Sequence, residues 1–123
     1  MSRVLLIDDD QPLRRAWRIA LERAGHRVVE ASDGREGIEA FGKEPFDLVI
    51  TDLIMPKKDG IMTIQELLLE FPWAKVIAIS GGPRGNPAWL PIAKRVGALR
   101  ILKKPFSSEE LVSAVRATLE VAA

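Results

Sequence analysis

Residues 48–56 read LVITDLIMP, and this stretch decides the fold because a carboxylate closes a continuous run of strand-forming residues. Consecutive apolar residues are typical of a strand that helices cover on both faces, as in a parallel α/β sheet. Asp52 would then lie at the carboxyl end of a buried strand. Ligands and reactive groups collect beyond such strand ends in open parallel sheets. Asp52 is therefore the first candidate functional residue of the chain.

The rest of the chain repeats this pattern, since short apolar runs alternate with segments of helical period. The predicted strands are 4–7, 27–31, 46–51, 75–80 and 100–103, and the predicted helices are 12–24, 33–41, 60–71, 88–95 and 107–119. The first, third and fourth strands are the most continuously apolar, which predicts that the other two flank them. We therefore expect an α/β fold with a doubly wound, five-stranded parallel sheet in the order 2-1-3-4-5 and helices on both faces.

The ends of two predicted helices carry capping signals. Asp10 stands just before Pro12 and is expected to cap the helix at 12–24. Ser107 and Glu110 have the spacing of a capping box at the start of the last helix. The predicted inward stripe of the first helix consists of Leu13, Ala16, Trp17, Ala20 and Ala24.

Length and composition predict a single domain that spans residues 1–123. The formal net charge is +1, so no overall field draws the chain onto nucleic acid or an anionic membrane. The absence of cysteine excludes disulfides, thiolate catalysis and cysteine-based zinc sites. The apolar run near the amino terminus is too short for a signal peptide or a membrane span. These properties predict a cytoplasmic protein.

Polar residues follow the predicted strands at the edge where Asp52 is expected. They are Asp8, Asp9 and Asp10 after the first strand, Ser80 after the fourth and Lys104 after the fifth. Neighbouring carboxylates repel one another, and oxygen ligands suit a hard cation such as Mg²⁺. Magnesium leaves coordination positions for phosphate oxygens, and a lysine with a hydroxyl would neutralise the rest of a phosphoryl group. Asp52 is ionised at neutral pH and needs no general base to accept that group.

Four motifs stand in order at these predicted strand ends. They are Leu6-Ile7-Asp8-Asp9-Asp10, Asp52 with Met55-Pro56 and Asp59-Gly60, Ser80-Gly81, and Lys104-Pro105-Phe106. Together they resemble the receiver domain of two-component response regulators, a chemotaxis-regulator-like domain with a flavodoxin-like fold. Each motif alone would be weak, but the four in this order cover essentially the whole chain.

The resemblance implies a role for each motif residue. The expected site comprises the phospho-acceptor Asp52, the Mg²⁺ ligands Asp8, Asp9, Asp52 and the backbone carbonyl of Ile54, the switch hydroxyl of Ser80 and the pairing lysine Lys104. Lys103 is the neighbour of that lysine and not its match. Asp10 is left out of the metal set because capping is its expected role. The resemblance also implies a cis peptide bond between Lys104 and Pro105.

The resemblance implies partners as well. A histidine kinase or histidine phosphotransfer protein would supply the phosphoryl group, and an unknown protein target would respond to it. Neither nucleic acid nor a membrane is an expected partner, and the chain would be a monomer or a weak homodimer. It would catalyse only its own phosphotransfer and slow autodephosphorylation. The expected partner surface combines the fourth helix, fifth strand and fifth helix, with exposed candidates Trp89, Lys94, Arg95 and Arg116.

Two features depart from the family pattern. Ile101 stands three residues before the lysine, where many receivers have tyrosine or phenylalanine, and this leaves the coupling to output open. Residues 81–87 read GGPRGNP, a long connection rich in glycine and proline. This connection is either a surface insertion or a segment that becomes ordered when Ser80 engages phosphate.

Three other functions remain open from the sequence. A Mg²⁺-dependent aspartyl-nucleophile phosphohydrolase typically has an acid/base aspartate two residues after the nucleophile, where this chain has Ile54. A nucleotide- or flavin-binding protein would have a glycine- or hydroxyl-rich loop after the first strand, not three aspartates. The third is a receiver-like interaction module that is not phosphorylated.

The last predictions concern three arginines and the histidine. Arg14, Arg15 and Arg18 would form either a solvated face or a docking site for an acidic partner helix. His26 is expected in a solvated loop.

Overall fold

The computed structural model describes residues 2–53, 60–81 and 89–121, and within these residues one parallel sheet forms the centre of the fold. Its strands are β1 (Arg3–Ile7), β2 (Arg27–Ala31), β3 (Leu48–Asp52), β4 (Val76–Gly81) and β5 (Arg100–Lys104). They lie in the order β2-β1-β3-β4-β5, and each neighbouring pair is parallel. The predicted strand order is therefore confirmed.

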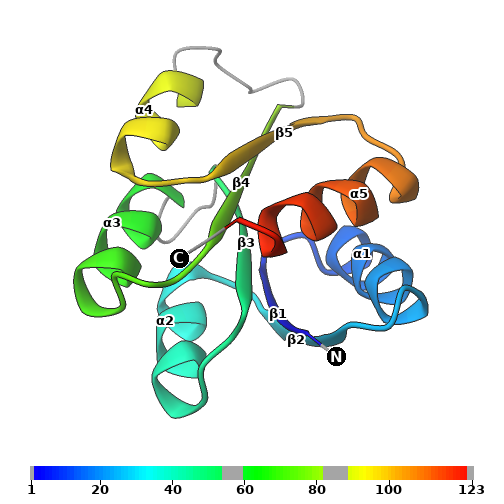
Figure 1. Cartoon of the computed structure of the whole chain (residues 1–123), viewed down its shortest axis with the longest axis horizontal. Helices are drawn as coiled ribbons and strands as arrows, with labels where there is room; N and C mark the ends of the chain where they lie inside the picture. The colour runs from blue at the N-terminus through cyan, green and yellow to red at the C-terminus, as the bar shows by residue number, and fades with distance from the viewer. Residues whose placement is uncertain (1, 54–59, 82–88, 122–123) are drawn as a thin grey trace.

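Helices cover both faces of this sheet (Figure 1). They are α1 (Gln11–Arg23), α2 (Gly34–Lys43), α3 (Gly60–Glu70), α4 (Trp89–Val96) and α5 (Ser108–Leu119). The helices α1 and α5 lie on one face, and α2, α3 and α4 lie on the other. The doubly wound α/β class is confirmed, and each described element ends within about two residues of its prediction.

The sheet separates two apolar clusters because successive side chains of a strand point to opposite faces. On β1, Leu5 and Ile7 belong to the cluster beneath α2, α3 and α4, whereas Val4 and Leu6 belong to the cluster beneath α1 and α5. All residues of β3 are buried. Burial on both faces explains why these strands are apolar at consecutive positions, and it fixes the backbone that leads to Asp52.

Side-chain caps begin three of the helices. The carboxylate of Asp10 accepts a hydrogen bond of 3.1 Å from the amide of Leu13. Ser107 Oγ accepts one of 3.0 Å from the amide of Glu110, whose side chain accepts in return from the Ser107 amide at 3.3 Å. Both predicted caps are confirmed. Asp33 caps α2 in the same way, one position before the helix and not within it.

The predicted inward stripe of α1 is wrong at several positions. Trp17 is buried as expected, but Ala16 and Ala24 are exposed. The buried residues of this helix are Arg14, Trp17 and Leu21. Their spacing keeps the helical period, but the helix is turned so that a charged residue occupies the buried face. That burial is possible because the charge of Arg14 is paired, as described below.

Two further residues differ from their predictions. Phe46 precedes β3 instead of belonging to it, although its side chain still lies in the apolar core. His26 is half-buried and not fully solvated, and its Nδ1 atom is buried without a hydrogen-bond partner among the described residues. No helix in the described part of the chain is long and apolar enough to cross a membrane.

Some predictions concern residues that lie outside the described part. These are the carbonyl of Ile54, the motif residues Met55-Pro56 and Asp59, and residues 82–87 of the glycine- and proline-rich connection. They stay predictions.

Candidate functional site

The candidate site lies at the edge of the sheet where the carboxyl ends of the parallel strands meet. Asp8 follows β1, Asp52 ends β3, Ser80 lies near the end of β4 and Lys104 ends β5. Ile7 is in register with Thr51, so Asp8 and Asp52 are the next residues on two adjacent strands. The fold thus assembles residues that are far apart in the sequence, which is what the pattern of strand ends predicts.

Gly60 allows α3 to begin directly behind Asp52. A Cβ atom at this position would lie 2.2 Å from the carbonyl oxygen of Asp52 and 2.6 Å from the Cα of Leu53. The amide of Gly60 also donates a hydrogen bond of 3.0 Å to the carbonyl of Leu53. Any larger residue would displace the backbone that carries Asp52.

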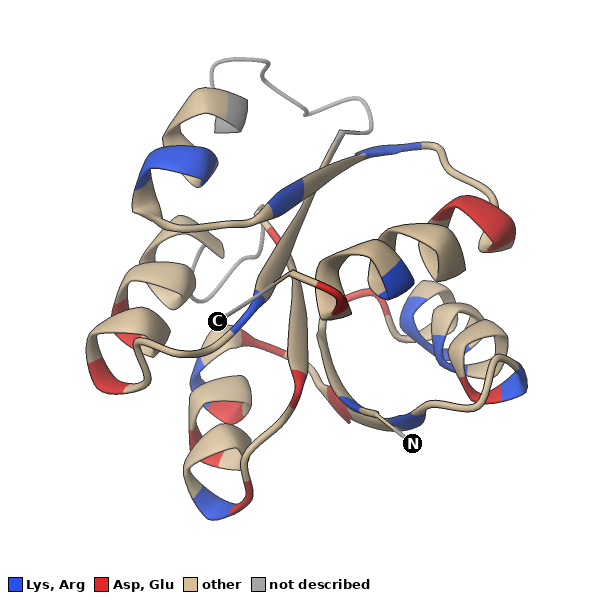
Figure 2. Ribbon diagram, viewed as in Figure 1, with Lys and Arg blue, Asp and Glu red and all other residues tan. Residues whose placement is uncertain are grey.

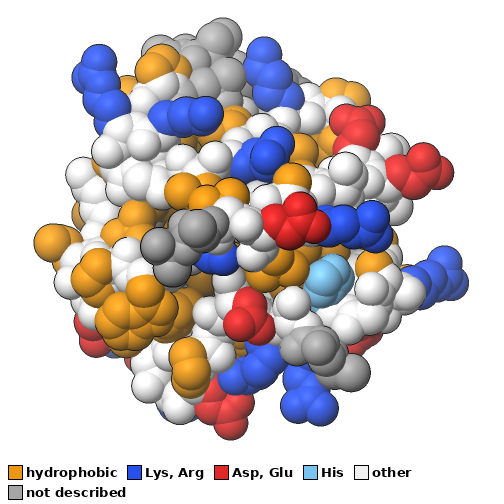
Figure 3. Space-filling view, viewed as in Figure 1, with side chains coloured by type: hydrophobic (Ala, Val, Ile, Leu, Met, Phe, Trp, Pro, Cys, Tyr) orange, Lys and Arg blue, Asp and Glu red, His pale blue; other side chains and the backbone are white. Residues whose placement is uncertain are grey.

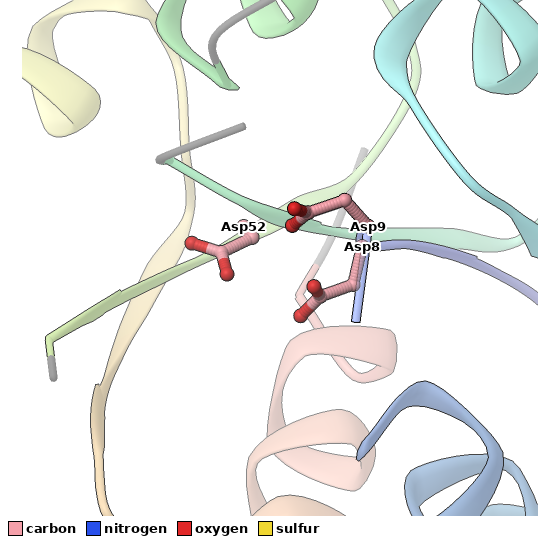
Figure 4. A group of neighbouring side chains, drawn as sticks. All are labelled: Asp8, Asp9 and Asp52. Carbon is pink, nitrogen blue, oxygen red and sulfur yellow. The ribbon is translucent and has the colours of Figure 1, made fainter. Parts of the chain in front are cut away.

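Three carboxylates form the acidic part of the site. Asp8, Asp9 and Asp52 each offer one oxygen atom, and these atoms lie within 4.8 Å of one another. Figure 4 shows the three side chains converging from the ends of β1 and β3. Asp8 and Asp52 are buried, whereas Asp9 is exposed. Two buried anions and one exposed anion present an oxygen-only donor set that fits a hard divalent cation.

Asp8 is the most constrained of these acids. Its amide donates a hydrogen bond of 3.2 Å to the carbonyl of Ala31, and its Oδ1 atom accepts one of 2.9 Å from the amide of Asp10. Its Oδ2 atom is buried and has no hydrogen-bond partner among the described residues. Burial, with a smaller contribution from the negative charge of Asp52, raises the pKa of Asp8 to about 7 even though the Asp10 amide acts in the opposite direction. A buried carboxylate oxygen that lacks a hydrogen-bond donor, in a group with a raised pKa, is a favourable ligand for a cation, since the cation removes the repulsion.

Lys104 provides positive charge on the other side of Asp52. Its Nζ atom donates a hydrogen bond of 2.9 Å to Asp52 Oδ2 and lies 3.9 Å from Asp8 Oδ2. Burial acts to lower the pKa of Lys104, but the hydrogen bond and charge of Asp52 outweigh it and raise that pKa. Lys103 points to the opposite face and is exposed. The structure thus brings Lys104, and not Lys103, to the acids.

Trp17 contacts this lysine, which sequence reasoning did not anticipate. The Lys104 ammonium lies 5.6 Å from the centre of the Trp17 ring, within cation–π range. The same ring stacks on Phe106, with 5.2 Å between ring centres. The motif lysine and the motif phenylalanine are therefore joined through a residue of α1. Nothing in the sequence around Trp17, apart from its apolar character, indicated a contact with Lys104.

Ser80 is buried near the end of β4, opposite Lys103 in the register of β5. Its position at the site edge agrees with the motif order. The peptide bond between Lys104 and Pro105 is cis, as the resemblance implies.

Arg14 of α1 is buried, so the prediction of a solvated face is wrong for this residue, whereas Arg15 is exposed. A docking role for these arginines stays a prediction. Glu30 of β2 accepts contacts from Arg14 at 2.7 Å, Arg18 at 3.0 Å and Arg15 at 3.1 Å. Basic positions recur along the ribbon of α1 (Figure 2). Burial acts to raise the pKa of Glu30, but the hydrogen bonds from Arg14 and Arg18 outweigh it and lower that pKa. Glu30 is therefore ionised, and both sequence interpretations of these arginines omitted it. The sequence did offer one indication of this ion pair, because Glu30 is a charged residue inside a predicted strand.

Comparison with known proteins gives consistent results. The family model of the response regulator receiver domain matches residues 4–116. The response regulator receiver protein CpdR of Brucella abortus is 34% identical over 119 residues, which cover 97% of this chain and 98% of CpdR. The transcriptional regulatory protein CpxR of Escherichia coli is also 34% identical over 119 residues, but the chain spans only 50% of its length.

Solved structures agree with this family. The chemotaxis protein CheY4 of Vibrio cholerae superposes with a TM-score of 0.88 at 28% identity, covering 96% of this chain and 98% of that one. The receiver domain of NtrX from Brucella abortus superposes with a TM-score of 0.90 at 27% identity, covering 97% and 99% of the two chains.

Proposed function

The chain belongs to the response regulator receiver domain family, whose members are phospho-acceptor modules of two-component signalling, and we propose that Asp52 is its phospho-acceptor. The observation that carries this proposal is the position of Asp52 between two kinds of charge. Asp8 and Asp9 follow β1, which lies on one side of β3. Lys104 comes from β5 on the other side, and its Nζ atom lies 2.9 Å from Asp52 Oδ2. A cation with the lysine would balance the charge of an incoming phosphoryl group.

Asp8, Asp9 and Asp52 are the proposed protein ligands of Mg²⁺, together with the carbonyl of Ile54. The buried Oδ2 atom of Asp8, which accepts no hydrogen bond from the described residues, supports this assignment, as does the oxygen-only donor set. When bound, Mg²⁺ would neutralise negative charge on the phosphoryl oxygens. Receivers in general bind Mg²⁺ at an acidic pocket.

The proposed donor is the phosphohistidine of a histidine kinase or of a phosphotransfer protein. A carboxylate oxygen of Asp52 forms a bond to phosphorus while the bond from phosphorus to the donor nitrogen breaks, and that nitrogen keeps the electron pair. Lys104 moves its hydrogen bond from Asp52 to a phosphoryl oxygen. The hydroxyl of Ser80 donates a hydrogen bond to another oxygen of the phosphoryl group. Both contacts strengthen as charge moves onto the transferred group.

The proposed output surface is formed by α4, β5 and α5. Its exposed basic residues include Lys94, Arg95 and Arg116. Basic side chains gather over α4 and β5 in the space-filling view (Figure 3). The basic side chains of α4 and β5 favour an acidic patch on the protein target, whereas the first turn of α5 carries exposed Glu109 and Glu110. Ile101 of β5 is half-buried and packs on the cluster beneath α2, α3 and α4. It therefore connects the output surface to the core that surrounds Asp52.

The proposal is tested by incubating the chain with acetyl phosphate and Mg²⁺ and measuring its intact mass. We expect an adduct of one phosphoryl group that requires Mg²⁺ and is absent in Asp52→Asn. Glu70→Gln removes an exposed carboxylate of α3 and is the matched control, which should form the adduct normally. An adduct that persists in Asp52→Asn contradicts the assignment. Multiple-turnover release of phosphate would indicate the hydrolase instead.

A further inference from the structure

Arg14 is a charged residue of α1 that is only 8% exposed. Its Nη1 atom donates a hydrogen bond of 2.5 Å to the backbone carbonyl of Asp8. Its Nε atom donates another of 2.7 Å to Glu30 Oε1. A buried guanidinium persists only when its charge is paired and its donors are used, so this position is built for these two contacts. One of them ends at the backbone of a proposed metal ligand.

The contact from Arg14 completes the immobilisation of Asp8. The amide of Asp8 is held by Ala31 at 3.2 Å, and its Oδ1 atom is held by the amide of Asp10 at 2.9 Å. Arg14 holds the third group, the carbonyl oxygen. With these three groups fixed, the carboxylate of Asp8 has a set position, and one of its oxygens lies within 4.8 Å of oxygens of Asp9 and Asp52. Fixed ligand positions favour Mg²⁺, which requires near-ideal octahedral geometry.

Glu30 keeps the positive charge of Arg14 from opposing a cation. A bare guanidinium behind Asp8 would repel Mg²⁺, but the ionised carboxylate of Glu30 lies 2.7 Å from its Nε atom. Arg15 and Arg18 contact the other oxygen of Glu30 and so hold it in place. The carboxylate of Glu30 therefore offsets part of the positive charge behind Asp8, while Arg14 supplies a directed hydrogen bond to the Asp8 carbonyl.

We propose that Arg14, paired with Glu30, is a positioning residue that sets the affinity of the site for Mg²⁺ by fixing the backbone of Asp8. The inference rests on the proposed function, since it takes Asp8 as a metal ligand. Groups that orient metal ligands typically change metal affinity by about 10- to 100-fold when they are removed. We expect the dissociation constant for Mg²⁺ to rise about tenfold in Arg14→Ala.

The experiment is a Mg²⁺ titration of the full chain followed by amide NMR shifts near Asp9 and Asp10, at constant ionic strength. Arg14→Ala is compared with wild type and with Arg15→Ala. Arg15 carries the same charge on the same helix and also contacts Glu30, but its side chain is exposed, and Arg14 is the arginine that binds the Asp8 carbonyl. Arg15→Ala should bind Mg²⁺ within about twofold of wild type, because a screened surface charge has little effect.

Arg14→Lys is the second variant. It keeps the positive charge, so its Mg²⁺ affinity can be measured even if the alanine variant does not fold. A lysine lacks the fork that reaches Glu30 and the Asp8 carbonyl together, so we expect weaker Mg²⁺ binding here too. Thermal melts in EDTA measure any loss of stability separately. Normal Mg²⁺ affinity in the folded Arg14 variants overturns the inference, because a purely structural role changes the melts and not the affinity. If wild type itself fails to bind Mg²⁺, the proposed function fails instead.

Discussion

Lys104 and Asp52 are joined by a hydrogen bond of 2.9 Å although β4 lies between their strands. The lysine side chain crosses the end of the intervening strand to reach the acid. This contact neutralises Asp52 before any phosphoryl group is present, and it places the ammonium where charge increases during transfer.

Replacing Lys104 by alanine should therefore slow phosphorylation. We expect the rate of adduct formation with acetyl phosphate and Mg²⁺ to fall by about 100-fold, the usual effect of losing one preorganised donor. Lys103→Ala removes the same charge one residue earlier from the exposed face and should retain the wild-type rate. Equal rates in the two variants would contradict the assigned role of Lys104.

Gly60 and Gly42 offer a matched pair of glycine-to-alanine changes in helices. At Gly60 the new methyl group would collide with the backbone of Asp52, and we expect a loss of about 1–3 kcal/mol in the free energy of unfolding. At Gly42 of α2 the nearest atom is 3.9 Å away, so alanine should stabilise the helix by about 0.5–1 kcal/mol. Urea denaturation measures both. Stabilisation by Gly60→Ala would show that the close contact with Asp52 is absent.

The two described tryptophan side chains should differ in their contribution to stability. Trp17 is buried between Lys104 and Phe106, so Trp17→Ala should reduce the free energy of unfolding by about 3 kcal/mol or more. Trp73 is 61% exposed and has one edge contact with Phe71, so Trp73→Ala should cost at most about 1 kcal/mol. Thermal or urea unfolding distinguishes the two, and similar losses would contradict the described burial.

His26 should make stability fall in mildly acidic solution. Burial lowers the pKa of His26 below its ordinary value, because the half-buried site disfavours the charged imidazolium. As the pH falls from about 7 to about 5, the unfolded chain binds the proton more readily than the folded chain, so the folded state loses stability. His26→Gln removes this contribution. The wild type should gain unfolding free energy relative to the variant as the pH rises from about 5 to about 7, and a pH-independent difference would contradict the prediction.

The sheet was predictable because strands buried on both faces have a distinctive sequence. β1, β3 and β4 are apolar at consecutive positions, and the contrast with β2 and β5 predicted the strand order. The strand-end positions of Asp8, Asp52 and Lys104 followed from that order. The spacing of the motifs along the chain therefore carried most of the geometry of the candidate site.

The side-chain contacts behind the site were not predictable in the same way. The buried face of α1 was misjudged because a periodicity argument rejects arginine from an apolar stripe, whereas Arg14 is buried by virtue of Glu30, 16 residues away. The contact of Trp17 with Lys104 likewise depends on how α1 packs against the end of β5. Long-range ion pairs and ring contacts leave no local pattern in one sequence.

The sheet that carries the site also separates the apolar core into two layers that can be redesigned one at a time. Val4 and Leu5 are neighbours in the chain, yet their side chains enter clusters on opposite sides of the backbone. Substitutions that lie more than about 7–10 Å apart and share no partners usually have additive effects on stability, to within about 0.5 kcal/mol. The layer beneath α1 and α5 can therefore be redesigned with its own set of residues, while the layer beneath α2, α3 and α4 is kept as it is.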